Sequence, residues 1–140
     1  MKKLFSTDYN DCSINAAFLI LRVGIGALML THGLPKLALI GGDSVQFATV
    51  FGLSAEISLS LAVFAEVICS VLLIVGLGTR LATIPLITTM LIAVFYIHGD
   101  SPFAKKEIGI IYLLIYVVLL ITGPGKYSLD QLLCNKKTSL

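Results

Sequence analysis

Apolar residues are concentrated in four stretches of the chain that are separated by more polar segments. The stretches cover residues 14–31, 57–78, 81–97 and 108–123, and they are 18, 22, 17 and 16 residues long. A helix needs roughly 17–25 residues to cross the hydrocarbon core of a bilayer. The pattern therefore predicts one all-α domain over residues 1–140, an integral membrane antiparallel four-helix bundle.

The connection between the first two stretches is the longest one. Within it, residues 44–53 carry several apolar side chains and few charges. We interpret this segment as a short interfacial element of the first outer loop, either an amphipathic helix at the membrane interface or a re-entrant segment. An ordinary lid that packs over the bundle is the alternative interpretation.

Composition supports a membrane protein. Hydrophobic residues make up 57% of the chain and charged residues 13%, and the mean hydropathy is +0.98. Soluble domains carry about 25% charged residues, so most of this chain is expected to contact the lipid bilayer. The net charge is only +2. Without a basic stripe that contains aromatic side chains, a nucleic-acid partner is not expected.

The positive charges predict the orientation in the membrane. With four spans both termini share one side. That side holds Lys2, Lys3, Arg80, Lys126, Lys136 and Lys137, whereas the other side holds Lys36, Lys105 and Lys106. Because positively charged flanks stay inside, both termini are predicted to be cytoplasmic.

Arg22 and Glu66 are the only charged residues inside the first two stretches. A charge at mid-membrane depth costs about 2.5–3.5 kcal/mol, so it persists when it is paired or functional. Helix rise puts Arg22 about 12 Å and Glu66 about 18 Å from the cytoplasmic side. We therefore expect a bidentate Arg22–Glu66 ion pair. Such a pair either binds a ligand or relays protons, or it only fixes how the helices pack.

A second group of polar residues lies at the outer ends of the predicted helices. It consists of His32, Lys36, Glu56, His98 and Glu107. These side chains can form a proton-accepting site beside a quinone, ligate a haem or bind a metal. Each histidine alone also fits a hydrogen-bonded interface residue. Because separate segments supply these residues without a spacing motif, a metal or haem site is not expected.

The cysteines do not form a redox motif. Cys12, Cys69 and Cys134 are far apart and no Cys-x-x-Cys occurs. Dithiol chemistry therefore lacks its paired thiols. No other self-contained catalytic motif is present, so any enzymatic role is expected to be that of a membrane subunit of an oxidoreductase.

Four strings in the chain resemble the DoxX family of small bacterial membrane proteins. They are LRVGIGALMLTHGLPKL (21–37), AEVICSVLLIVGLGTRLA (65–82), TTMLIAVFYIH (88–98) and GPGKYSLD (123–130). The order and spacing agree over most of the chain. The resemblance implies a multi-pass protein of the bacterial cytoplasmic (inner) membrane.

The resemblance also implies that the polar positions of the family are Arg22, His32, Lys36, Glu66, Thr79, Arg80, His98 and Asp130. Together with the two polar groups described above, this makes five residues the expected ligand-binding residues: Arg22, His32, Lys36, Glu66 and His98. The expected structural motif residues are Gly33, Thr79, Arg80, Gly123, Pro124, Gly125 and Asp130. Members of the family and their relatives have been linked to redox work, as a small subunit of thiosulfate:quinone oxidoreductase and as a membrane partner in complexes that handle oxidative stress.

These observations predict a redox-associated membrane subunit with a polar small-molecule site inside the membrane, for which a quinone is the candidate ligand. A soluble or membrane redox enzyme is the expected protein partner. Two other classes remain open. One is a non-enzymatic scaffold for a soluble partner, and the other is a protein that handles small solutes or lipids.

Overall fold

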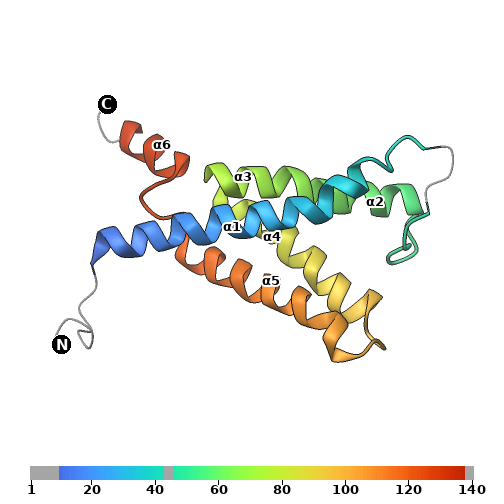
Figure 1. The fold of residues 1–140 in the computed structure, drawn as a ribbon. Coiled ribbons are helices and arrows are strands. Elements are labelled where there is room, and N and C mark those ends of the chain that lie inside the picture. The colour runs from blue at the N-terminus through green and yellow to red at the C-terminus, as the bar shows by residue number, and fades with distance from the viewer. Residues whose placement is uncertain (1–9, 43–45, 138–140) are drawn as a thin grey trace.

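A computed structural model describes residues 10–42 and 46–137 of the chain, and the regular structure of this part is entirely helical (Figure 1). The elements follow one another as α1 (Asp11–Leu37), α2 (Ala55–Val63), η2 (Phe64–Cys69), α3 (Ser70–Val75), α4 (Thr79–Leu91), η3 (Ile92–Ile97), α5 (Phe103–Thr122) and α6 (Leu129–Lys137). The segments η2 and η3 are π-helical. Thus α2, η2 and α3 form one continuous rod, and α4 and η3 form another.

Three of these rods are long and apolar enough to cross a membrane. They cover Asp11–Leu37, Ala55–Val75 and Thr79–Ile97. The helix α5 is 20 residues long, but Lys105, Lys106 and Glu107 lie near its start. After these three charged residues, the uncharged part of α5 is limited to the 15 residues from Ile108 to Thr122.

Apolar side chains lie on the outside of the helices as well as in the core. Ile20, Leu81 and Ile121 are each more than 70% exposed. The core between the rods contains Ile25, Met29, Leu73, Leu86, Tyr116 and Leu119, which are almost fully buried. Apolar residues on both sides of a helix are typical of a bundle that lies in lipid rather than in water.

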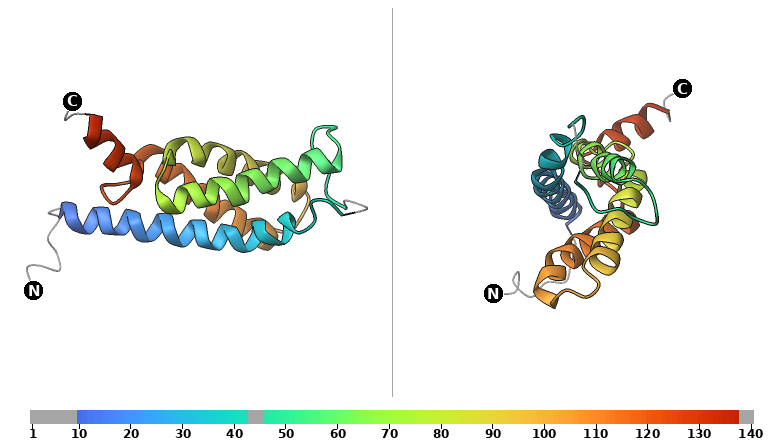
Figure 2. Two further views of the ribbon diagram at one scale, coloured as in Figure 1. Left: turned by 90° about the horizontal axis from the view of Figure 1, so that it is seen from above. Right: turned by 90° about the vertical axis from the view of Figure 1, so that its right-hand side faces the viewer.

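The bundle has two distinct ends (Figure 2). At the first, which we call the α6 end, α1, α4 and α6 begin and α3 and α5 terminate. The start of α1 projects beyond the neighbouring rods there. At the opposite end, α1 and η3 terminate and α2 and α5 begin. Residues 46–54 lie at this opposite end; we call them the lid segment and this end the lid end.

The lid segment corrects one prediction. Residues 46–54 contain no helix, so the interfacial helix expected over residues 44–53 is absent from the described part of that range. Residues 44 and 45 lie outside the described residues. A hydrogen bond of 3.0 Å from Leu53 N–H to the Val50 carbonyl closes a turn instead. Residues of the segment line a cavity of the bundle, a position that agrees with the alternative interpretation of a lid over the bundle.

The first helix is longer than its apolar stretch predicted. It continues from residue 31 to Leu37 and contains Pro35. Proline removes one helical hydrogen bond, but the helical bonding resumes beyond it, where Ala38 N–H donates to the Leu34 carbonyl at 3.2 Å. The consequence is that Lys36 lies in the last turn of α1 rather than in a loop.

Candidate functional site

An ion pair between Lys36 and Glu66 lies in the interior of the bundle. The distance from Lys36 Nζ to Glu66 Oε1 is 2.5 Å. The Glu66 side chain is 2% exposed and the Lys36 side chain 30%. The other carboxylate oxygen, Glu66 Oε2, is buried and has no hydrogen-bond partner among the described residues. One acceptor atom of the pair is therefore available to a ligand or a water molecule.

The local structure of two helices brings these side chains together. Glu66 belongs to the π-helical segment η2, and π-helical turns are rare and frequent at functional sites. On α1, Gly33 lies one turn before Lys36. A Cβ atom on Gly33 would lie 3.0 Å from both the Cβ and the backbone carbonyl carbon of Glu66. The glycine therefore allows α1 to approach η2 closely enough for Lys36 to reach Glu66.

Replacing Gly33 with alanine tests this close approach. The new methyl group would contact the backbone of η2, which cannot move aside as a flexible side chain can. We expect a loss of about 1–2 kcal/mol in the free energy of unfolding, in the range for overpacked sites. Unfolding in detergent micelles measures it. Gly24→Ala is the matched control, because a Cβ there meets nothing within 4 Å; an equal loss in both variants would contradict the explanation.

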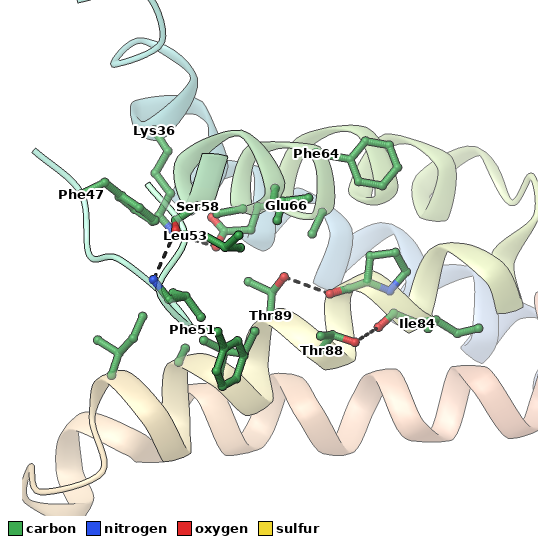
Figure 3. Close-up of a pocket in the computed structure, with 18 residues that line it drawn as sticks. Lys36, Phe47, Phe51, Leu53, Ser58, Phe64, Glu66, Ile84, Thr88 and Thr89 are labelled. Carbon is green, nitrogen blue, oxygen red and sulfur yellow. Dashed lines mark hydrogen bonds and ion pairs between the residues drawn. The ribbon is translucent and has the colours of Figure 1, made fainter. Parts of the chain in front are cut away.

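The pair forms part of the wall of an otherwise apolar cavity of about 410 Å³ (Figure 3). We call it the apolar cavity; it lies between α2–η2, α4–η3 and the lid segment. Its apolar lining includes Phe47, Val50, Phe51, Leu61, Ala62, Phe64, Ile84, Ile92 and Ile97. Its size falls within the range of about 300–1,000 Å³ that is typical of small-molecule sites.

The other polar groups of the apolar cavity are already engaged. The hydroxyl of Thr88 donates to the Ile84 carbonyl at 2.9 Å, and that of Thr89 donates to the Pro85 carbonyl at 2.9 Å. Ser58 Oγ accepts from Val50 N–H at 3.2 Å. Lys36 and Glu66 therefore supply the charged groups of the cavity, and they are the groups that a ligand's polar end would meet.

The lid segment is held over the apolar cavity by three contacts. Val50 donates to Ser58 as described, the Phe51 ring lies 5.1 Å from that of Tyr96, and Lys36 Nζ lies 5.8 Å from the centre of the Phe47 ring. Phe51 has a φ of 50°, a left-handed conformation that is unfavourable for an aromatic residue. Backbone strain of this kind is frequent at ligand sites.

A second, more polar pocket lies on the other side of the ion pair. This polar pocket has a volume of about 260 Å³ and is lined by Met29, His32, Lys36, Glu66, Met90, Ala93, Val94, His98, Lys105, Ile108, Gly109 and Tyr112. The rings of His32 and Tyr112 meet edge to face, with 5.8 Å between their centres. Lys36, Glu66 and Ala93 line both spaces. The ion pair thus separates an apolar cavity from a polar pocket.

Comparison with known proteins gives the family. The family model named DoxX matches residues 17–99, which is more than half of the chain. The chain belongs to the DoxX family. The matched region runs from α1 to the end of η3 and therefore contains Lys36, Glu66 and His98.

Two similar proteins come from Haemophilus influenzae, and both are described as uncharacterized. One is 34% identical over 83 residues, which are 56% of this chain and 55% of that protein. The other is 28% identical over 123 residues, which are 79% of this chain and 86% of that protein. The match to the first therefore spans only about half of its length. No solved structure matches this DoxX-family chain.

The structure divides the expected site residues of this DoxX-family chain into two groups. His32, Lys36, Glu66 and His98 line the polar pocket together. Glu56 and Glu107, which we expected beside the histidines, are exposed and do not line either space. Residues that the sequence analysis did not assign to the site include Ala93, Thr89 and Phe51. For Tyr112, the sequence indicated only an aromatic residue near the membrane interface.

The expected Arg22–Glu66 ion pair is wrong. Arg22 Nη2 donates to the Tyr127 carbonyl at 2.7 Å, and Glu66 pairs with Lys36. Fourteen residues separate Arg22 from Lys36 on α1, or about 21 Å at the helical rise. Arg22 is 1% exposed and lies beside Gly76, the left-handed residue that ends α3. It is therefore close to the α6 end and not at the depth of Glu66.

The expected structural motif residues at the α6 end join three helices. Asp130 accepts hydrogen bonds from Gly78 N–H at 2.7 Å and from Thr79 N–H at 3.0 Å. It thereby caps the start of α4. Its own N–H donates to the Gly76 carbonyl at 2.9 Å. Arg80 Nη2 donates to the carbonyl of Ile121 at 3.2 Å, near the end of α5.

The segment Gly123-Pro124-Gly125 turns the chain from α5 toward α6. Gly123 and Gly125 have φ values of 82° and 77°, which glycine adopts readily and other residues rarely do. Ser128 Oγ then accepts from Gln131 N–H at 3.3 Å at the start of α6. These contacts connect the end of α5 with the start of α6, and the structural role of the motif stays a prediction.

Proposed function

We propose that this DoxX-family chain binds a quinone in the apolar cavity and acts as the membrane subunit of a redox system. One observation carries the proposal: a buried ion pair, Lys36–Glu66, lies in the wall of a cavity that is otherwise apolar. The apolar side chains would hold the ring and the tail of the ligand, and the ion pair would meet its oxygen atoms. The redox part of the proposal comes from the family resemblance.

The chemistry of the pair suits both forms of such a ligand. The Lys36 ammonium group is a donor for a quinone carbonyl. Glu66 Oε2 has no partner among the described residues, so it is an acceptor for the hydroxyl group of the reduced form. A protein of this kind exchanges electrons with a separate redox enzyme, because the quinone itself carries them.

The topology that we propose is a four-helix transmembrane bundle in the bacterial cytoplasmic membrane. The helix α5 contributes an uncharged length of 15 residues from Ile108 to Thr122, about 22 Å at the helical rise. Lys105 and Lys106 would extend to the headgroups. Because Lys36 pairs with Glu66 inside the bundle, it no longer counts as a positive flanking charge of the outer side. The remaining flanking charges therefore favour cytoplasmic termini more strongly than the count from the sequence alone.

The experiment is purification in a mild detergent, followed by solvent extraction and mass spectrometry. We expect about one quinone per chain in the native protein. Ala62→Phe fills the apolar cavity and should reduce bound quinone at least tenfold, and decylubiquinone added afterwards should not restore it. Ala27→Phe is the matched control, because Ala27 is exposed and lines neither space.

Two results would overturn this function. The first is native protein that contains no quinone and binds no added decylubiquinone. The second is a phospholipid that is retained in place of a quinone and is lost in Ala62→Phe, which would favour the lipid-handling class. A soluble protein that co-purifies equally with the native chain and with Ala62→Phe would favour the scaffold class.

A further inference from the structure

We infer that the polar pocket is a one-sided water and proton route to the Lys36–Glu66 pair, and that it opens at the lid end. The inference deepens the proposed function, because it states from which side of the membrane a bound quinone exchanges protons. It stands on the arrangement of the two spaces around the ion pair and needs no ligand to be present.

The lining of the polar pocket leads from the surface to the pair. Three lining residues are exposed: Lys105 and Ile108 at the start of α5, and His32 on α1. His98, just after η3, is half-buried. Deeper in the same pocket lie Lys36 and Glu66. Two imidazole groups in this position are suited to pass protons between water and a carboxylate, because each ring can both donate and accept a proton.

The opposite direction is closed by apolar packing. Between Glu66 and the α6 end lie Leu73, Leu86 and Leu119, all with 0% exposure. Buried polar atoms in that region include Ser70 Oγ, Thr79 Oγ1 and Tyr116 Oη, and none of them has a hydrogen-bond partner among the described residues. Thr83 Oγ1 donates to the Arg80 carbonyl, and Arg22 Nη2 donates to the Tyr127 carbonyl. The hydrogen bonds of the described residues therefore form no continuous path from Glu66 to the α6 end.

The apolar cavity is also a poor route for protons. It is bounded by aromatic and aliphatic side chains, and its hydroxyl groups donate to backbone carbonyls. A ligand that enters from the lipid through this cavity would therefore reach the ion pair from one side, while water reaches the pair from the other.

Several charged or titratable groups face Glu66 from the helices around it. They are Lys36 and His32 on α1, His98 after η3, and Lys105, Tyr112 and Tyr116 on α5. In the step that we propose, the O–H bond of a quinol hydroxyl group breaks and its proton forms an O–H bond on a carboxylate oxygen of Glu66, while the quinol oxygen keeps the electron pair. The proton then passes from Glu66 to pocket water and His98, and the electrons of the quinol pass to the separate redox enzyme.

Cysteine accessibility in membrane vesicles tests the route. Cys12, Cys69 and Cys134 are first replaced by Ser, Ala and Ser. Ala93→Cys then places a thiol where the two spaces meet. The probe is a membrane-impermeant trimethylammonium methanethiosulfonate, added to one side of the vesicles at a time.

Two reporters identify the sides without any assumption about orientation. Ile108→Cys reports the lid end, and a chain that retains only Cys12 reports the α6 end. We expect Ala93→Cys to react at least tenfold faster from the side that labels Ile108→Cys. His98→Trp should narrow the polar pocket and slow the reaction of Ala93→Cys at least fivefold without slowing that of Ile108→Cys.

Thr89→Cys is the matched control, because Thr89 lines the apolar cavity alone. It should react slowly from both sides. If Thr89→Cys reacts as fast as Ala93→Cys, or if Ala93→Cys reacts from the Cys12 side, the inference is overturned. If Ala93→Cys does not fold, Met90→Cys, which lines only the polar pocket, takes its place; an unreactive, folded Met90→Cys also overturns the inference.

The failure of this inference is distinguishable from failure of the proposed function. Labelling is measured on protein without added ligand, whereas quinone content is measured by extraction. If Ala93→Cys is labelled from one side but the protein contains no quinone, the water route is supported and the quinone proposal is rejected. If the protein contains quinone but Ala93→Cys is not labelled, the quinone proposal is supported and the water route is rejected.

Discussion

Replacement of Lys36 by methionine is expected to lower the free energy of unfolding by about 3 kcal/mol, at the low end of the range for breaking a buried ion pair. Glu66, which is 2% exposed, would lose its partner and keep a buried charge. The loss is limited because Lys36 is itself 30% exposed, and water already reaches part of the pair. Unfolding by SDS titration in detergent micelles, followed by circular dichroism, measures this change.

Two further variants separate the ion pair from other effects of the substitution. Lys105→Met removes an exposed lysine from the same pocket and should leave the unfolding transition unchanged. Lys36→Met combined with Glu66→Leu should recover most of the lost stability, because no unpaired charge remains. A double variant as unstable as Lys36→Met alone would show that the pair is not the source of the effect.

The same single variant should also empty the apolar cavity. Without the ammonium group, no charged donor faces the ligand's oxygen atoms, and an unpaired Glu66 repels electron-rich carbonyls. The double variant is informative here because it restores stability without restoring the donor. Bound quinone in that stable double variant would show that the ion pair does not recognise the ligand.

The helices could be predicted from the sequence because each one carries its own signal. A long uncharged apolar run predicts a helix in lipid almost regardless of its neighbours. The resemblance to the DoxX family likewise rests on local strings, and the family match confirms it. The bounds were less accurate: the end of α1 was placed before Gly33 and Pro35, although the helix continues to Leu37.

The pairing of charges could not be predicted in the same way. Depth along a helix follows from residue count, but rotation about the axis and the offset of one helix against another depend on packing. Arg22 and Glu66 were placed about 6 Å apart in depth by counting. In the structure Arg22 lies beside Gly76, at the end of α3. The close approach at Gly33 and the wide turn η2 instead bring Glu66 to Lys36.

The α6 end shows a second limit of sequence reasoning. The spacing within Gly123–Asp130 indicated a turn and a structural motif, but nothing local indicates that Asp130 caps α4, more than fifty residues earlier in the chain. A cap supplied by a distant residue has no sequence signature of its own. Only the docking of the segment after α5 against the start of α4 reveals it.

This docking leads to the second large effect. Asp130→Asn is expected to lower the free energy of unfolding by about 3 kcal/mol, from a lost charge-assisted cap and from lost compensation of a buried cation. An amide offers one acceptor oxygen where the carboxylate serves both Gly78 and Thr79. It also removes the negative charge that interacts with Arg22, whose Nε and Nη1 have no hydrogen-bond partner in the described part of the chain.

A double-mutant cycle separates these two contributions. In an Arg22→Met background no buried cation needs compensation, so Asp130→Asn should cost only about 1 kcal/mol, the typical value of a lost helix cap. SDS titration of the four proteins gives the coupling energy directly. Asp11→Asn is the control, because Asp11 pairs with Lys126 at 3.4 Å on the exposed surface and should not change the transition. Equal costs of Asp130→Asn in both backgrounds would mean that Asp130 only caps α4, and that the buried Arg22 is stabilised by its hydrogen bond to the Tyr127 carbonyl without help from the carboxylate.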